Sequence, residues 1–162
     1  MAALSLALYR ERYPGAPLAE RPPDPELLAL IREWQARQYR PRCVRATVRY
    51  WLSSLGGKPE YAPARLRLPD SEDPHLLCFG PRPNTRFPLY FRRAHAAVPY
   101  RLERGEGVCR IYVYDPDYPR DSGRRVTFRR GGTEFEYGRI SSREGWGIVL
   151  VPLSAIQVTK RR

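Results

Sequence analysis

The sequence has no long hydrophobic run that would mark a membrane helix. Its longest uncharged apolar stretch, Met1 to Leu8, is about half the length of a bilayer span. Tyr9, Arg10 and Glu11 follow it instead of the small residues of a leader cleavage site. Neither a signal peptide nor a membrane helix is predicted, and no membrane partner is expected.

Cysteine and lysine are both scarce. Three cysteines, Cys43, Cys78 and Cys109, cannot all pair, and their spacing matches neither a disulfide framework nor a zinc site. A reducing compartment is the simplest interpretation, so a cytoplasmic location is expected, and no metal or organic cofactor is implied. Lysine supplies only two of the 29 basic residues, Lys58 and Lys160, and arginine supplies the rest.

The charge balance is strongly basic. A net charge of +12 attracts polyanions, because neutralised phosphates release their counterions. The basic residues are spread along the chain in short runs such as 129–130 and 160–162, so no discrete nucleic-acid module is indicated. Electrostatic association with nucleic acid or an acidic protein is the partner class that this composition allows.

Length and composition indicate one globular domain. The 162 residues, 42% hydrophobic and 28% charged, suffice for a single core. Residues 1–25 are predicted to form a proline-rich arm and residues 26–162 a single α+β domain. We expect N-terminal helices packed on a C-terminal antiparallel sheet, because helical spacing comes first and alternating, β-branched residues follow.

Two helices and several strands are predicted. Asp24 and Pro25 suit the start of a helix that runs to about Gln38, and apolar spacing predicts a second helix at about 43–55. Residues 58–88 are rich in proline and charge, so a long connection with one short strand is expected there. The predicted strands are 87–91, 94–102, 108–114, 125–128, 134–137 and 147–153.

Two residues of chemical interest lie on the arms of one predicted hairpin. A turn signal at 105–107 places Asp115 opposite residues 95–97. The Cβ atoms of His95 and Asp115 are then about 4.5 to 8 Å apart if both side chains point to the same face of the sheet. A carboxylate in that position accepts a hydrogen bond from the imidazole Nδ1 and fixes the tautomer of the ring.

Cys43 lies where a nucleophile would be expected. It is at the start of the second predicted helix, where unpaired backbone amides and the helix dipole favour a thiolate. A thiolate, a histidine and an acid that orients the histidine form the Cys-His-Asp arrangement of acyl transfer. Gln38 precedes Cys43 by five residues and offers a further donor to an oxyanion.

These segments resemble a known family. Residues 95–102, His-Ala-Ala-Val-Pro-Tyr-Arg-Leu, and 110–119, Arg-Ile-Tyr-Val-Tyr-Asp-Pro-Asp-Tyr-Pro, look like the histidine and aspartate half of papain-like cysteine peptidases. The likeness is greatest to the bacteriocin-processing (double-glycine leader) peptidases, in which a histidine opens one strand and the next ends in Asp-Pro. The segment 43–52 is similar to the nucleophile helix of the family, and Gln38 to its oxyanion glutamine.

The resemblance implies a fold and an activity. It implies the papain-like cysteine peptidase fold and cleavage of a peptide or amide bond in a peptide or protein substrate through a thioester. Cys43 would be the nucleophile, His95 the general base and then the acid, and Asp115 the residue that orients His95. Gln38 and backbone amides would form the oxyanion hole.

Other interpretations of the same residues stay open. Cys43 is also what a small buried apolar residue looks like, and Asp115 and Pro116 are ordinary turn residues. The chain would then be a catalytically inactive domain of the same fold that binds an acidic protein or nucleic acid. Alternatively, it corresponds only to the second half of a family member, and the nucleophile is absent or on a partner.

Overall fold

Seven β-strands and two short α-helices make up most of the part of the chain that the structure describes. This computed structural model describes residues 29, 32, 33, 36, 40–52, 59, 61–81, 94–118, 120–129 and 134–156. The helices are α3 (Pro41–Leu52) and α4 (Tyr61–Arg65), and a 3₁₀ turn, η3 (Leu153–Ala155), follows the last strand. The strands are β1 (His75–Pro81), β2 (His95–Gly105), β3 (Val108–Tyr114), β4 (Arg125–Arg129), β5 (Phe135–Tyr137), β6 (Ile140–Ser141) and β7 (Trp146–Pro152).

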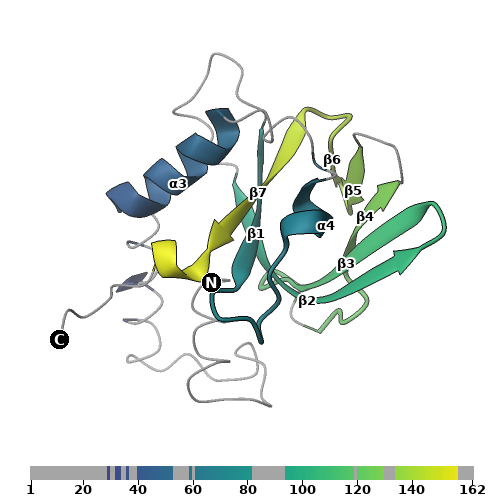
Figure 1. The fold of residues 1–162 in the computed structure, drawn as a ribbon, viewed down its shortest axis with the longest axis horizontal. Helices are drawn as coiled ribbons and strands as arrows, with labels where there is room; N and C mark the ends of the chain where they lie inside the picture. The colour runs from purple at the N-terminus through teal and green to yellow at the C-terminus, as the bar shows by residue number, and fades with distance from the viewer. Residues whose placement is uncertain are drawn as a thin grey trace.

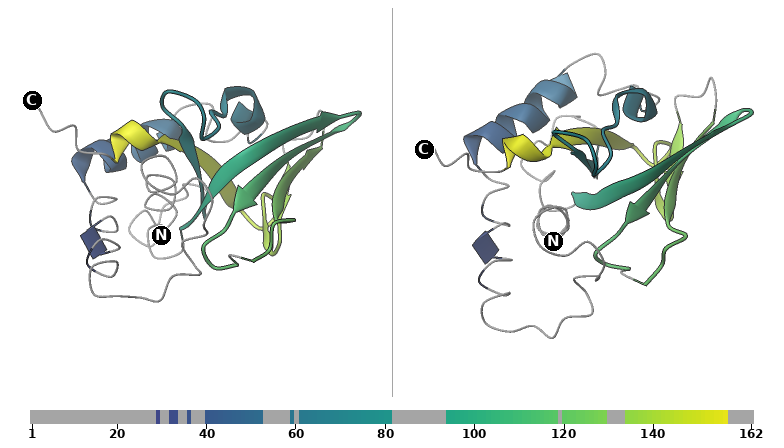
Figure 2. Two further views of the ribbon diagram at one scale, coloured as in Figure 1. Left: turned by 90° about the horizontal axis from the view of Figure 1, so that it is seen from below. Right: turned by 60° about the horizontal axis from the view of Figure 1, so that its bottom comes forward.

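All seven strands belong to one antiparallel sheet. Their order is β6-β5-β4-β3-β2-β1-β7, so a meander from β1 to β6 is completed by β7, which returns to pair with β1. The sheet curls until β6 approaches β7 (Figure 1; Figure 2). The result is a nearly closed, barrel-like sheet, a shape that leaves few exposed strand edges.

The hydrophobic core lies inside this curved sheet. Strand residues alternate between the two faces, and the inward face of the sheet contributes the side chains of this core. Strands β1 and β7 also bury residues on the other face, among them Leu76, Val149 and Val151. Burial is complete or nearly so for Leu77, Phe79, Ala97, Ile111, Val113, Val126, Phe128, Phe135, Tyr137 and Ile148. Ala62 of α4 belongs to the same cluster, so this short helix contributes to the core of the sheet.

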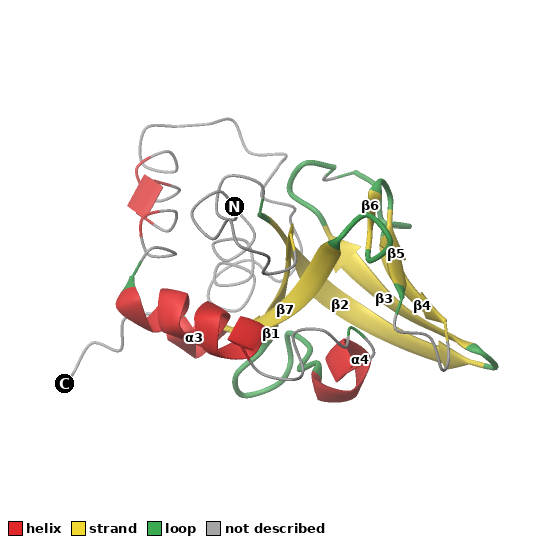
Figure 3. Cartoon of the chain, turned by 90° about the horizontal axis from the view of Figure 1, so that it is seen from above, coloured by secondary structure: helices red, strands yellow, loops and turns green. Residues whose placement is uncertain are grey.

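The predicted fold class is wrong. The sequence predicted N-terminal helices packed on an antiparallel sheet in the papain-like arrangement, whereas the described chain is mostly a curled sheet that encloses its own core. The reason is that β1 and β7 pair along seven residues, and a contact so distant in sequence leaves no local pattern. Of the described helices, α3 packs against β7, and α4 also contacts β7 (Figure 3).

Several individual elements are confirmed. Strand β3 has the predicted bounds, 108–114, and β2, β4, β5 and β7 differ from their predictions by a few residues at most. The second predicted helix is α3, which begins at Pro41 and contains Cys43. The predicted arm 1–25 and the strand 87–91 lie outside the described residues, as does nearly all of the helix predicted up to Gln38.

The helices have one further property of note. None of those in the described ranges combines the length and the apolar character needed to span a bilayer.

Candidate acid–base site

The site is built where four neighbouring strands reach the same end of the sheet. His95 opens β2, Asp115 directly follows β3, Arg124 directly precedes β4, and Tyr137 closes β5. Consecutive antiparallel strands run in opposite directions, so the start of one lies beside the end of the next. The polar side chains of four segments therefore converge although up to 42 positions separate them in the sequence.

The register of the β2–β3 hairpin places His95 beside Asp115. Val98 pairs with Tyr114, and one more step along the ladder sets Asp115 opposite Ala97, so His95 is its diagonal neighbour. His95 Nε2 lies 3.0 Å from Asp115 Oδ2. The structure thus brings these two predicted site residues together, through Nε2 where the sequence analysis expected Nδ1.

Asp115 is a buried carboxylate with a full set of donors. Its residue is 1% exposed, and Oδ1 accepts a hydrogen bond from the Asp117 amide at 2.9 Å. Oδ2 accepts from His95, from Arg124 Nε at 3.1 Å and from the Tyr137 hydroxyl. Because an ionised carboxylate only accepts hydrogen bonds, His95 must carry its proton on Nε2 when it bonds to this oxygen.

These contacts favour the ionised form of Asp115. Burial by itself would raise the pKa of the carboxyl group. The hydrogen bonds from Tyr137 and the Asp117 amide, together with the charge and hydrogen bond of His95, outweigh burial and lower the pKa of Asp115 below its ordinary value. Asp115 is therefore an anion at neutral pH and a permanent acceptor for the imidazole.

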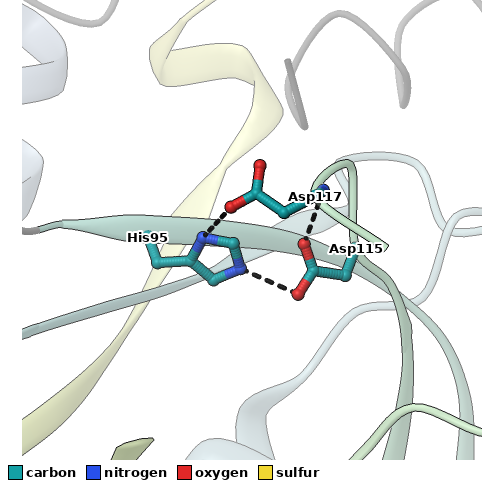
Figure 4. Close-up of side chains that lie close together, drawn as sticks. All are labelled: His95, Asp115 and Asp117. Atoms are coloured by element: carbon teal, nitrogen blue, oxygen red, sulfur yellow. Dashed lines mark hydrogen bonds and ion pairs between the residues drawn. The ribbon is translucent and has the colours of Figure 1, made fainter. Parts of the chain in front are cut away.

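The other ring nitrogen of His95 points toward the surface. His95 Nδ1 lies 3.5 Å from Asp117 Oδ2, and the Asp117 side chain is 70% exposed, against 21% for that of His95 (Figure 4). The ring also packs near the aromatic rings of Phe79 and Tyr137, with centroids 6.1 Å away in both cases. One nitrogen is thus held in the protein, and the other is within reach of a solvent-borne group.

His95, Asp115 and Asp117 have ligand atoms within 4.8 Å of one another, which raises the question of a metal site. The chemistry of the set argues against one. The two carboxylates face different ring nitrogens, and Asp115 already accepts four hydrogen bonds, one of them from the cationic Arg124. A cation would have to displace donors and approach a guanidinium, so these residues fit proton transfer better than metal binding.

Cys43 has a different neighbourhood. It is buried in the first turn of α3, as the sequence predicted. Burial raises the pKa of the Cys78 thiol to about 12, and the nearby Cys43 thiol adds to this effect. Cys78 pairs with Ala96 and Phe79 pairs with His95, so Cys78 and His95 project from opposite faces of the sheet.

The structure therefore sets Cys43 near Cys78, a residue that points away from the His95 face. Pairing of Cys43 with His95 stays a prediction. None of the three cysteines forms a disulfide. Gln38, the predicted oxyanion donor, lies outside the described residues.

Sequence reasoning missed two members of the site. Tyr137 was predicted as an ordinary strand residue, and Arg124 was one arginine among many in a basic chain. The available signal was topological: in an antiparallel meander, residues at the start of β4 and at the end of β5 meet the end of β3. Nothing in the local sequence distinguishes Arg124 from its neighbour Arg125.

His75, the second histidine, is not in this site. His75 opens β1 and is partly buried. Its Nδ1 accepts a hydrogen bond from the Arg67 amide at 3.1 Å. Burial first, and then the charge of Arg67, lower the pKa of His75 below its ordinary value.

Comparison of the chain with protein-family models, with curated proteins and with solved structures found no match in any of the three.

Proposed function

We propose that this protein is a hydrolase of peptide or amide bonds in which His95 is the acid–base residue and Asp115 orients it. The observation that carries the proposal is the hydrogen bond of 3.0 Å between His95 Nε2 and a buried, ionised Asp115. This bond fixes the ring and its tautomer, so that Nδ1, which lies 3.5 Å from the exposed Asp117 carboxylate, is the nitrogen that would accept a proton. The likeness of these segments to double-glycine leader peptidases supports a peptide substrate.

Cys43 lies near Cys78, which projects from the face of the sheet opposite His95, so the proposal takes water as the nucleophile and not the Cys43 thiol that the sequence predicts. His95 would take a proton from this water at Nδ1 as the water oxygen forms its bond to the carbonyl carbon. The departing amine would receive that proton from His95 as its bond to the carbonyl carbon breaks, which leaves a carboxylic acid and an amine. Asp115 stays ionised throughout and stabilises the transient imidazolium.

Labelling with iodoacetamide at mildly acidic pH tests the nucleophile that the sequence predicts, the Cys43 thiol. Peptide mass spectrometry measures the modification rate of each cysteine separately. A thiolate–imidazole pair predicts that Cys43 reacts much faster than Cys78 and Cys109, and that His95→Gln removes the difference. Equal, slow modification of all three cysteines in the native protein would rule out Cys43 as an activated nucleophile.

Hydrolysis itself is tested on a library of short peptides with the native protein, His95→Gln and Cys43→Ala. His95→Gln is expected to lower kcat/KM by about 10² to 10⁴. Loss of activity in His95→Gln with retention in Cys43→Ala supports the proposal. Loss of activity in both variants would instead assign the nucleophile to the Cys43 thiol, and full activity in His95→Gln would refute the acid–base role.

A second candidate function, that of a polyanion-binding module, is favoured by the outer face of the sheet. Arg101, Tyr112 and Arg125 form one row across β2, β3 and β4, on the face opposite the buried Ile111 and Val126. The Arg101 guanidinium lies 3.8 Å from the centroid of the Tyr112 ring. Arginines interleaved with an aromatic ring suit the backbone and bases of single-stranded nucleic acid.

Titration of oligouridylate at several salt concentrations tests this second function. The double variant Arg101→Gln/Arg125→Gln is expected to reduce the slope of log affinity against log salt by roughly two. The double variant Arg65→Gln/Arg143→Gln removes the same charge elsewhere on the chain and serves as the control. Equal losses in the two double variants would show attraction by net charge alone, without a binding face.

A further inference from the structure

Arg124 contacts the acid–base pair from a strand that carries neither of its members. It lies directly before β4, and its backbone carbonyl accepts a hydrogen bond from the Val113 amide of β3 at 3.0 Å. Its Nε is 3.1 Å from Asp115 Oδ2 and 3.1 Å from the Tyr137 hydroxyl. The Arg124 Nε–H group therefore contacts two atoms of the site. One is Asp115 Oδ2, which also accepts from His95, and the other is the Tyr137 hydroxyl oxygen, whose own proton is donated to Asp115 Oδ2.

The guanidinium group of Arg124 makes two further contacts that restrict its movement. The guanidinium carbon lies 3.5 Å from the centroid of the Tyr118 ring, and Nη1 is 3.6 Å from Asp121 Oδ2. Only 21% of the side chain is exposed. A flat cation that is stacked, ion-paired and hydrogen-bonded loses little further freedom when it holds a partner. Arg124 is thus a rigid support rather than a solvated surface charge.

We propose that Arg124 is the positioning residue of the acid–base pair: its Nε–H and the Tyr137 hydroxyl hold Asp115 Oδ2 at the point where it accepts the His95 Nε2 proton. The inference rests on the proposed function, in which His95 transfers protons through its other nitrogen. Arg124 acts through Asp115 and has no contact with the reacting atoms. Its effect on catalysis comes from the charge and the direction of the carboxylate.

The electrostatic reason is the burial of Asp115. A carboxylate that is 1% exposed is costly unless a cation and hydrogen-bond donors compensate for its lost hydration. Among the four described donors to Asp115, Arg124 is the permanently charged one, because a guanidinium does not lose its proton in proteins. Contacts with Tyr137 and Asp115 raise the pKa of Arg124 further, although burial opposes this. Without it, Asp115 would bind a proton more readily and cease to orient the imidazole.

The test compares Arg124→Gln and Arg124→Lys with a matched control, Arg120→Gln. The control removes the same charge four residues earlier in the chain, from an exposed side chain. The first measurement is the pH titration of the Asp115 carboxyl carbon by NMR, assigned with Asp115→Asn. The second is kcat/KM for peptide hydrolysis as a function of pH.

We expect the Asp115 titration to move to higher pH in Arg124→Gln, to move less in Arg124→Lys, and to match the native protein in Arg120→Gln. The value of kcat/KM for hydrolysis is expected to fall by about tenfold or more in Arg124→Gln and to recover in part in Arg124→Lys. Lysine keeps the positive charge but lacks the planar guanidinium group with its fixed donor geometry. If Arg124→Gln does not fold, Arg124→Lys supplies both readouts.

The inference is overturned if Asp115 titrates in Arg124→Lys and Arg124→Gln as it does in the native protein. It is equally overturned if Arg120→Gln causes the same shift. A shifted titration in a protein without detectable hydrolysis would preserve the role of Arg124 and refute the proposed function. The two failures are therefore distinguishable.

Discussion

At the scale of single residues, Asp115 is the most consequential side chain of the described chain. It connects β3 to β2 through His95, to β4 through Arg124 and to β5 through Tyr137. Each of these donors would lose a charged acceptor if the carboxylate were removed. Hydrogen bonds to charged groups contribute more than neutral ones, so stability and proton transfer depend on the same group.

Asp115→Asn is expected to lower both activity and stability. The amide keeps the volume but presents an N–H group to at least one of the donors. Breaking a buried ion pair costs roughly 3 to 5 kcal/mol, and loss of the imidazole orientation lowers kcat/KM by about 10² or more. Urea unfolding and peptide hydrolysis measure the two effects. Native-like values for both would show that the network is dispensable.

A second effect at the scale of single residues is the contribution of His75 to the pH dependence of folding stability. The pKa of His75 is lowered in the folded protein, chiefly by burial, so the unfolded chain binds a proton at higher pH than the folded one. Stability therefore rises with pH through the interval below the ordinary value of 6.5, and it is lost as pH falls through that interval.

His75→Asn is expected to remove this component. The asparagine Oδ1 can take the place of Nδ1 as acceptor for the Arg67 amide, but it does not titrate. The free energy of unfolding, measured by urea denaturation between pH 7 and pH 5, should fall less steeply in the variant than in the native protein. Identical slopes would show that His75 titrates alike in the folded and unfolded chains.

At the scale of elements, the register of the β2–β3 hairpin on which the site depends is set by its turn and by a bulge between Pro99 and Arg101. Gly107 has φ +71°, and a Cβ added there would meet no atom within 4 Å, whereas a Cβ added at Gly105 meets only the Val108 carbonyl, at 3.8 Å. A side chain at Gly107 would therefore be strained by its backbone conformation and not by crowding.

Gly107→Ala is expected to destabilise the protein by about 1 to 2 kcal/mol, while Gly105→Ala should change stability far less. Thermal unfolding of the two variants under identical conditions measures the difference. Equal effects would mean that left-handed geometry at Gly107 does not hold this turn. A large loss of His95-dependent activity in Gly107→Ala would further show that the hairpin register supports the site.

The elements also show how far the sequence alone could go. Alternation and turn residues predicted β3 to its bounds and the neighbourhood of His95 and Asp115, because both signals are local. Neither the pairing of β1 with β7 nor the curl of the sheet has a local signature. The predicted architecture therefore relied too heavily on the helical spacing of apolar residues. Arg124 was missed for a similar reason, since only the strand order brings it to Asp115.

At the scale of the whole molecule, one end of a curled sheet collects polar residues while its interior stays apolar. Phe79 and Tyr137 lie between the apolar interior and the polar residues, and their parallel rings have centroids 4.7 Å apart. The Tyr137 hydroxyl leaves this apolar stack to reach Asp115, and its burial, followed by its hydrogen bond to Asp115, raises the pKa of Tyr137. The core thus forms the floor of the acid–base site and limits the access of water to Asp115.

The central claim is that Asp115 holds the His95 ring by Nε2 and leaves Nδ1 to transfer protons. Long-range ¹H–¹⁵N correlation of the two imidazoles measures this directly, with assignments from His75→Asn and His95→Gln. The account predicts that the neutral ring of His95 carries its proton on Nε2, and that Asp115→Asn shows a mixture of the two tautomers. A His95 that exchanges between both tautomers in the native protein, or that carries its proton on Nδ1, would contradict it.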